Sequence, residues 1–311
     1  MGLARTLFLW ASQSRWLREQ LPRRRFARAA VARFLPGEDL DAALGAAARL
    51  RAQGIASVLT RLGENVTDAA EAEAVAAHYV AALDRVAALG LDAHLSVKLT
   101  QLGLDLGVET AWRNLERVAG VAAERGSMVW LDMEQSRYTD ATLELYRRAR
   151  ARWACTGVCL QANLRRTPAD LEALLPLGPA IRLVKGAYLE PRSRAYATRR
   201  AVDAAYLRLA DRLLEARAQG DGAVRIGFGT HDRRLHRRIA ERAAERGVPR
   251  DGYEIQMLYG ILPETQRRLA AAGHRVRVLI SYGDAWFAWY MRRLAERPAN
   301  IFFVLRSLAA R

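Results

Sequence analysis

Cysteines and long apolar runs are scarce in this chain, and each scarcity excludes a class of protein. The 311 residues include two cysteines, Cys155 and Cys159, and no second pair completes a structural zinc site or a disulfide framework. A chain without such a framework is expected in a reducing compartment. No apolar run reaches the roughly 20 residues of a membrane-spanning helix. Residues 1–9 lack an adequate signal-peptide core, so we expect a cytoplasmic protein.

Histidine is also rare, and several catalytic motifs are missing. The five histidines show no metal-ligand spacing, and His231 and His236 have basic neighbours that would repel a cation. The chain contains neither a Gly-Lys-Ser/Thr phosphate loop nor a Gly-x-Ser-x-Gly nucleophile elbow. We therefore expect no metal site.

The charge is strongly positive. Lys and Arg number 49 against 33 Asp and Glu, which gives a formal net charge of +16. Such a charge is compatible with nucleic acid or an anionic membrane as partner. The arginines are spread over all the predicted helices, however, and the densest run, Pro22–Arg25, is too short for a basic arm. A non-catalytic barrel that binds nucleic acid or anionic lipid stays open as an alternative.

Short apolar, β-branched runs recur at wide intervals along the chain. Most of them are continuous, which is typical of strands buried on both faces of a parallel sheet. The predicted strands are Ile55–Leu59, His94–Lys98, Val129–Met133, Val158–Ala162, Ile181–Lys185, Val224–Phe228, Tyr253–Met257 and Val276–Ile280.

Segments with helical spacing lie between these strands, for example Ala69–Ala88 and Val202–Gln219. Eight strand–helix units in roughly 250 residues predict an α/β fold, a closed (β/α)₈ barrel of the TIM type. An open doubly wound sheet is the alternative, but it would normally have a glycine-rich turn after the first strand. Residues 1–50 show helical patterns only, so we expect an N-terminal helical extension followed by a catalytic barrel domain over residues 51–311.

Polar residues follow or end most of the predicted strands. In a (β/α)₈ barrel these strand ends meet at one face, where active sites are built. Lys98 and Asp132 could also form an ion pair whose only role is to neutralise the barrel mouth. The polar residues within or after the predicted strands are Lys98, Asp132, Glu134, Gln161, Asn163, Arg182, Lys185, Thr230, His231, Asp232 and, inside its strand, Gln256.

A short aromatic and basic helix is predicted near the end of the chain, between an N-cap at Asp284 and Pro298. It carries the adjacent pair Arg292 and Arg293. If this helix covers a cavity, the two planar guanidinium groups can converge on a carboxylate. The alternative is an amphipathic surface helix whose arginines are solvated.

Several of these segments together resemble the proline dehydrogenase family in its monofunctional bacterial form. No segment is decisive alone, but all occur in the family's order, from about residue 55 to the end of the chain. The matching segments are Leu62–Glu64, Ser96–Gly103, Leu131–Glu134, Leu160–Ala162, Arg182–Tyr188, Gly229–Asp232, Glu254–Gly260 and Tyr290–Asn300.

The resemblance implies an FAD-binding barrel that oxidises L-proline to Δ1-pyrroline-5-carboxylate and passes electrons to membrane quinone. It implies that Arg292 and Arg293 hold the substrate carboxylate and that Glu296 steadies them. Lys98 and Asp132 would line the substrate side, with Tyr188 and Leu258 against the substrate ring. The implied flavin-binding residues are Gln161, Arg182, Val184, Lys185, Gly186, Ala187, Thr230, His231 and Gln256. A cation near the flavin, Arg182 or Lys185, would stabilise its reduced form.

Two positions depart from the family pattern. Leu279 stands where a tyrosine is usual in the eighth strand, and Asn163 replaces a tyrosine after the fourth. The loss of the tyrosine at 279 favours a substituted proline, such as hydroxyproline or an N-alkylproline, as an alternative substrate. Tyr282 could instead swing in to supply the missing hydroxyl. The apolar residues Leu7–Trp10 could aid peripheral membrane contact.

Overall fold

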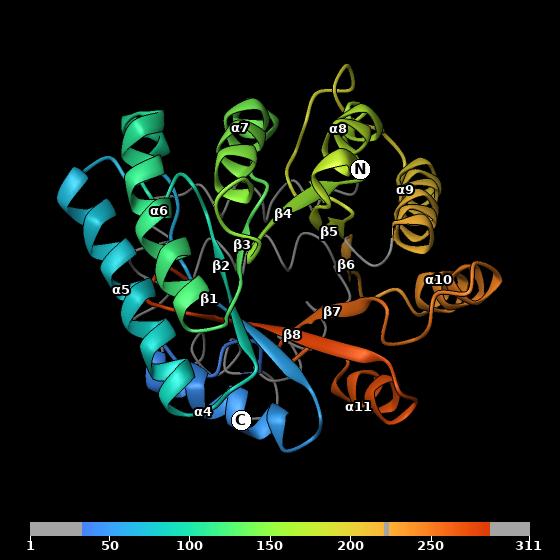
Figure 1. Cartoon of the computed structure of the whole chain (residues 1–311), viewed down its shortest axis with the longest axis horizontal. Coiled ribbons are helices and arrows are strands. Elements are labelled where there is room, and N and C mark those ends of the chain that lie inside the picture. The colour runs from blue at the N-terminus through green and yellow to red at the C-terminus, as the bar shows by residue number, and fades with distance from the viewer. Residues whose placement is uncertain (1–32, 221–223, 287–311) are drawn as a thin grey trace, which may run out of the picture.

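The computed structural model describes residues 33–220 and 224–286, and their strands form a closed parallel barrel (Figure 1). Each strand pairs with the next along the chain, and β8 returns to pair with β1 through six register positions, Ala56 with Arg277 to Arg61 with Tyr282. The strands are β1 (Ala56–Arg61), β2 (Ala93–Val97), β3 (Val129–Leu131), β4 (Thr156–Gln161), β5 (Ala180–Val184), β6 (Arg225–Gly229), β7 (Glu254–Leu258) and β8 (Arg275–Tyr282).

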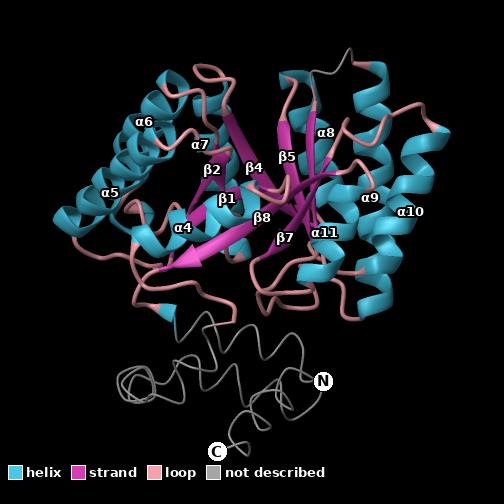
Figure 2. Cartoon of the chain, turned by 90° about the horizontal axis from the view of Figure 1, so that it is seen from below, coloured by secondary structure: helices cyan, strands magenta, loops and turns pink. Residues whose placement is uncertain are grey.

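Helices surround the barrel on its outer side (Figures 1 and 2). Apolar residues on the outward faces of the strands pack against these helices and form the main hydrophobic core. The helices are α4 (Leu40–Arg51), α5 (Ala69–Ala88), α6 (Val108–Glu124), α7 (Thr139–Arg150), α8 (Thr167–Leu174), α9 (Arg199–Gln219), α10 (Arg233–Glu245) and α11 (Pro263–Ala271).

The predicted fold class is confirmed. All eight predicted strands coincide with observed ones to within a few residues, and α5 has the predicted bounds. Helix α9 begins three residues before its predicted start, because the Thr198 hydroxyl caps it by accepting the Ala201 N–H at 3.2 Å. Helix α4 lies within the predicted extension and contributes Leu44 and Leu50 to the core. The boundary near residue 50 stays a prediction, because residues 1–32 lie outside the described part.

The interior of the barrel differs from its outer layer because inward side chains alternate with outward ones along each strand. Near the middle, Val58, Trp130 and Leu279 belong to a small apolar cluster. At the end where the strands begin, Glu254 accepts hydrogen bonds from Arg277 at 3.0 and 3.1 Å and from Arg225 at 2.7 Å. We call these three charged residues the closed-end cluster.

No helix among the described residues is long and apolar enough to cross a bilayer.

Candidate active site at the barrel mouth

Five polar side chains converge at the other end of the barrel, where strands β2 to β5 finish. The Arg182 guanidinium donates to an Asp132 oxygen at 2.5 Å, to the Ser96 hydroxyl at 2.6 Å and to the Cys159 thiol at 2.7 Å. Ser96 also donates to Asp132 at 2.8 Å, and the Lys98 ammonium lies 3.7 Å from the other Asp132 oxygen. We call Ser96, Lys98, Asp132, Cys159 and Arg182 the mouth cluster.

The mouth cluster holds Asp132 in its ionised form. Burial alone would raise the pKa of this carboxyl, but the charges of Arg182 and Lys98 outweigh burial, so that the pKa is lowered. Burial raises the pKa of the Cys159 thiol to about 12, which leaves it protonated at neutral pH. Two cations therefore surround one anion, and the cluster carries a net positive charge suited to an anionic ligand.

Of the predicted residues, Gln161 ends β4, Gln256 lies within β7, and His231 follows β6. Gln161 donates from its amide nitrogen to the carbonyls of Met133 and Glu134 at 2.7 and 2.8 Å, which fixes its oxygen as a free acceptor. Gln256 donates to Glu254 at 2.9 Å in the same way. The Nε2 atom of His231 accepts the Leu258 N–H at 2.9 Å, so its Nδ1 carries the proton when the ring is neutral.

Several buried polar atoms at this mouth have no hydrogen-bond partner among the residues that the structure describes. Unpaired buried polar groups are rare in native proteins and suggest a ligand or ordered water. They are the Gln161, Asn163 and Gln256 side-chain oxygens, the Arg182 Nη1 and the Ser281 hydroxyl. Acceptors and a charged donor of this kind fit the polar edge of a flavin, so the residues present are compatible with the cofactor that the sequence implies.

Strand β6 presents bare backbone to the barrel interior. A Cβ added to Gly227 would lie 2.6 Å from the Gln256 amide nitrogen, and one added to Gly229 would lie 2.8 Å from Val184 and 3.3 Å from the Leu183 carbonyl. Both glycines are therefore required by close packing. This wall of the mouth offers backbone, not side chains, to a ligand.

The predicted residues after β5 lie in a loop between that strand and α9. Lys185 is already paired with carboxylates, at 2.5 Å from Asp203 and 3.5 Å from Asp232. Gly186 has a φ of 98°, and an added Cβ would overlap the Asn163 side chain. Val184, Ala187, Tyr188 and Leu258 are partly exposed at the same end, and Thr230 is buried.

The idea that Tyr282 supplies the missing hydroxyl is wrong. Tyr282 points outward, is 1% exposed and shares a hydrogen bond of 2.9 Å with His78 of α5. Alternation along β8 instead turns Leu279 and Ser281 inward. The inward hydroxyl nearest in sequence to Leu279 is therefore that of Ser281.

Sequence reasoning missed Ser96 and Cys159 as members of the site. Both lie inside strands, whereas most of the polar residues that indicate the site in the sequence end or follow a strand. They could have been found from the alternation of side chains along a strand, which brings every second residue to the same face. Ser96 is two residues before Lys98, and Cys159 is two residues before Gln161, so each pair shares the inward face. Arg292, Arg293 and Glu296 lie outside the described residues, and their roles stay predictions.

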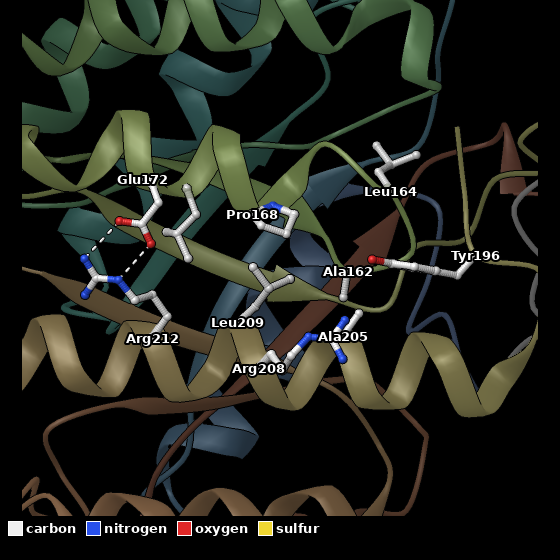
Figure 3. A pocket seen from close by; sticks show the side chains of 10 residues that line it. Ala162, Leu164, Pro168, Glu172, Tyr196, Ala205, Arg208, Leu209 and Arg212 are labelled. Carbon is white, nitrogen blue, oxygen red and sulfur yellow. Dashed lines mark hydrogen bonds and ion pairs between the residues drawn. The ribbon is translucent and has the colours of Figure 1, made fainter. Parts of the chain in front are cut away.

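A separate hollow of about 250 Å³ lies outside the barrel, between α8 and α9 (Figure 3). Leu164, Pro168 and Leu209 give it an apolar lining, and the Glu172–Arg212 ion pair closes one side at 2.7 Å. It contains none of the mouth cluster, so we place the candidate chemistry at the mouth and not in this hollow.

The sequence is similar to known proteins over most of its length. The family model described as proline dehydrogenase matches residues 43–306. Proline dehydrogenase 1 of Bacillus subtilis subsp. natto is 35% identical over 306 residues, 98% of this chain and 99% of the relative. Proline dehydrogenase of Deinococcus radiodurans is 36% identical over 295 residues, with 93% of each chain covered.

The fold is shared with larger proteins of known structure. Proline utilization A from Bdellovibrio bacteriovorus, inactivated by N-propargylglycine, superposes with a TM-score of 0.80 at 24% identity over 87% of this chain. The protein of that name from Corynebacterium freiburgense gives 0.76 at 22% identity over 98% of this chain. The present chain spans about a third of the length of those two structures.

Proposed function

Since the chain belongs to the proline dehydrogenase family, we propose that it oxidises L-proline to Δ1-pyrroline-5-carboxylate, or a close cyclic relative to the corresponding imine or iminium product, with FAD as cofactor and quinone as final acceptor. The reaction removes a hydride from a ring carbon and a proton from the ring nitrogen, and a C=N bond forms between them. The observation that carries the proposal is the mouth cluster together with the unpaired polar atoms around it.

FAD, when bound, supplies the two-electron acceptor that no side chain can provide. The residues proposed to hold it are Gln161, Arg182, Val184, Lys185, Gly186, Ala187, Thr230, His231 and Gln256. Lys185 is paired with two carboxylates, whereas Arg182 faces one and keeps Nη1 unpaired. Arg182 is therefore the better candidate for the cation that stabilises negative charge on the cofactor.

The residues proposed for substrate binding form two groups, one that binds the substrate's charge and one that contacts its ring. Arg292 and Arg293 bind the carboxylate, steadied by Glu296, while Tyr188 and Leu258 contact the ring. Holding one end of the substrate in this way fixes the reacting carbon in place.

Asp132 has an electrostatic role in this proposal. Its lowered pKa makes it a weak base, so it does not take the proton from the ring nitrogen. It positions Lys98 and Arg182 and keeps their charges at the mouth. The ring nitrogen must then give its protons to solvent: the ammonium proton before the hydride leaves, and the remaining N–H proton when the C=N bond is complete.

The test is the absorption spectrum of the purified protein, before and after reconstitution with FAD. We expect a flavin band at about 450 nm that L-proline bleaches without oxygen, since proline then reduces the cofactor. A colourless protein that takes up no FAD would defeat the proposal. Salt-sensitive DNA binding by such a protein would favour the basic binding barrel instead.

We further propose a cytoplasmic location with peripheral contact at the membrane, because quinone is lipid-soluble. The net charge of +16 would favour anionic lipid. Co-sedimentation with anionic liposomes at low salt, with and without residues 1–25, tests this. Equal absence of binding in both forms would refute it.

A further inference from the structure

A second hollow, of about 240 Å³, lies between helices α10 and α11, and no residue of the mouth cluster lines it. Three arginines and two histidines line it: Arg233, His236 and Arg237 on α10, Arg268 on α11, and His274 in the turn before β8. No acidic side chain is among the lining residues. The hollow therefore concentrates positive and proton-binding groups from three segments.

The arginines are poorly neutralised. Arg233 has no carboxylate within ion-pair distance among the described residues, and Arg237 lies 3.7 Å from the exposed Glu241. Arg268 pairs with Glu264 at 3.2 Å, where both side chains are largely exposed. Exposed pairs of this kind contribute little, so the guanidinium groups remain available to a ligand.

The histidines add two buried nitrogens without partners. His236 is 5% exposed, and its Nε2 is 2.9 Å from the Thr230 carbonyl, so this nitrogen donates and Nδ1 is left over. The Nδ1 atoms of His236 and His274 have no hydrogen-bond partner among the residues described. Burial lowers the pKa of both rings, and the charges of Arg233 beside His236 and Arg250 beside His274 lower it further.

We propose that this hollow, which we call the α10–α11 site, binds an oxyanion of the size of phosphate or sulfate. Guanidinium groups form charge-assisted hydrogen bonds with such oxygens. A bound dianion would also favour protonation of the imidazoles, so that Nδ1 becomes a further donor. The proposal does not depend on the function of the barrel mouth.

Sulfate is the probe, because it stays a dianion across the accessible pH range. We expect saturable binding by calorimetry in the full-length protein. The double variant Arg233→Gln/Arg237→Gln should lose about tenfold or more in affinity, as two charge-assisted contacts disappear. The matched control is Arg113→Gln/Arg117→Gln, which removes two exposed charges with the same spacing on α6. Equal affinity in both double variants, or an effect that chloride reproduces at equal ionic strength, would overturn the proposal.

The single variant Arg268→Gln keeps the test decisive if the double variant folds poorly. It removes a donor from the opposite wall and should weaken sulfate severalfold while the melting temperature without sulfate stays unchanged. Unchanged sulfate affinity in a folded Arg268→Gln protein would contradict the site.

The pH dependence has a defined sign. Sulfate affinity should rise as the pH falls from about 8 to about 6, because the bound anion raises the pKa of the two imidazoles. A sulfate affinity that does not change with pH would mean that the histidines take no part in binding, and would contradict the proposal. The charged and titratable groups around them are Asp232, Arg233, Arg237, Glu241, Arg250, Tyr253, Glu264 and Arg268.

Competition with vesicles distinguishes the two possible natural sources of the oxyanion. If vesicles that contain phosphatidic acid displace sulfate in wild type but bind less to the double variant, the ligand is a lipid headgroup. If inorganic phosphate displaces sulfate and the vesicles do not, the ligand is a soluble phosphate. Failure of every phosphate source to compete with sulfate would overturn the assignment.

Discussion

The two ends of the barrel interior are both charged, but they are completed in different ways. At the closed end, Arg277 donates to Glu254, to the Ser57 carbonyl at 3.0 Å and to Asp92 at 2.9 Å. At the mouth, Arg182 also has three partners, yet its Nη1 and several neighbouring oxygens have none among the described residues. The charged groups at the closed end bind one another, whereas the unpaired atoms at the mouth are available to a ligand.

Trp130 lies between these two regions. Its indole N–H donates to His94 at 3.2 Å on the closed side, and its ring faces the Arg182 guanidinium at 5.3 Å on the other. Burial, and then the charge of Arg277, lowers the pKa of His94 well below its usual value, so this ring is neutral. The same kinds of residue thus support folding at one end and are available for chemistry at the other. The predictions below separate these two roles.

The largest effect is expected from Arg277→Met at the closed end. This change leaves Glu254 buried without its principal partner, and breaking a buried ion pair costs about 3–5 kcal/mol of folding free energy. Denaturant unfolding measures it, with Arg275→Met, an exposed position two residues earlier, as the control. A loss as small as that of the control would mean that the closed-end cluster is not structural.

The next largest effect is expected from acid, which should lower the free energy of unfolding through Glu254 at the closed end. Burial raises the pKa of Glu254, but the charges of Arg277 and Arg225 outweigh burial and lower it far below its usual value. A depressed carboxyl pKa gives stability that is present above the unfolded value, near 4.3, and is lost as the pH falls toward the folded value. Unfolding free energies between about pH 6 and 3 should fall more steeply in wild type than in Glu254→Gln. Parallel curves would contradict this linkage.

At the mouth, Asp132→Asn should damage turnover more than folding. The amide keeps the shape but removes the charge that holds Lys98 and Arg182, and preorganised electrostatic groups contribute about 10²–10³-fold in rate. The measurement is kcat/KM with an artificial acceptor, alongside the flavin spectrum, with Asp251→Asn as an exposed control. Normal turnover in Asp132→Asn would remove this residue from the proposed site.

Arg292→Met and Arg293→Met should each lower kcat/KM by about ten- to a hundredfold. Each removes a charge-assisted contact of roughly 1.5–3 kcal/mol to the substrate carboxylate, while flavin should stay bound. Arg113→Met serves as the control for loss of one surface charge. If both variants turn over a carboxylated substrate like wild type, the arginines are solvated surface residues.

The smallest effect is expected from Leu279→Tyr, which should improve activity on L-proline by about tenfold or less and sharpen discrimination against larger rings. The variant Leu279→Phe adds the aromatic ring without the hydroxyl, and so separates the effects of these two groups on activity. A panel of L-proline, hydroxyproline and N-alkylprolines measures all three proteins. If wild type already strongly favours L-proline and the tyrosine brings no gain, the leucine is a neutral replacement.

The sequence predicts the barrel because its signals are local. Continuous apolar runs such as Val129–Leu131 mark strands buried on both faces, and segments with helical spacing fill the intervals. Polar residues at strand ends predict the mouth, and the structure brings Lys98, Asp132 and Arg182 together there.

The closed-end cluster and the inner members of the mouth could not be found in the same way. Arg225, Glu254 and Arg277 belong to three strands, and their pairing depends on how the barrel closes. Tyr282 was misjudged because its direction follows from its place relative to Leu279, an odd number of residues away. Period-two counting from one inward residue would have corrected that prediction.

The bare wall at Gly227 and Gly229 sets a limit on redesign of this enzyme. Any library that enlarges these positions would displace Gln256 or Val184 before it reached a substrate. Diversity is better placed on β8, two strands along from β6, where Leu279 and Ser281 already present side chains to the interior. Variants of altered substrate range should therefore accumulate on β8 and not on β6.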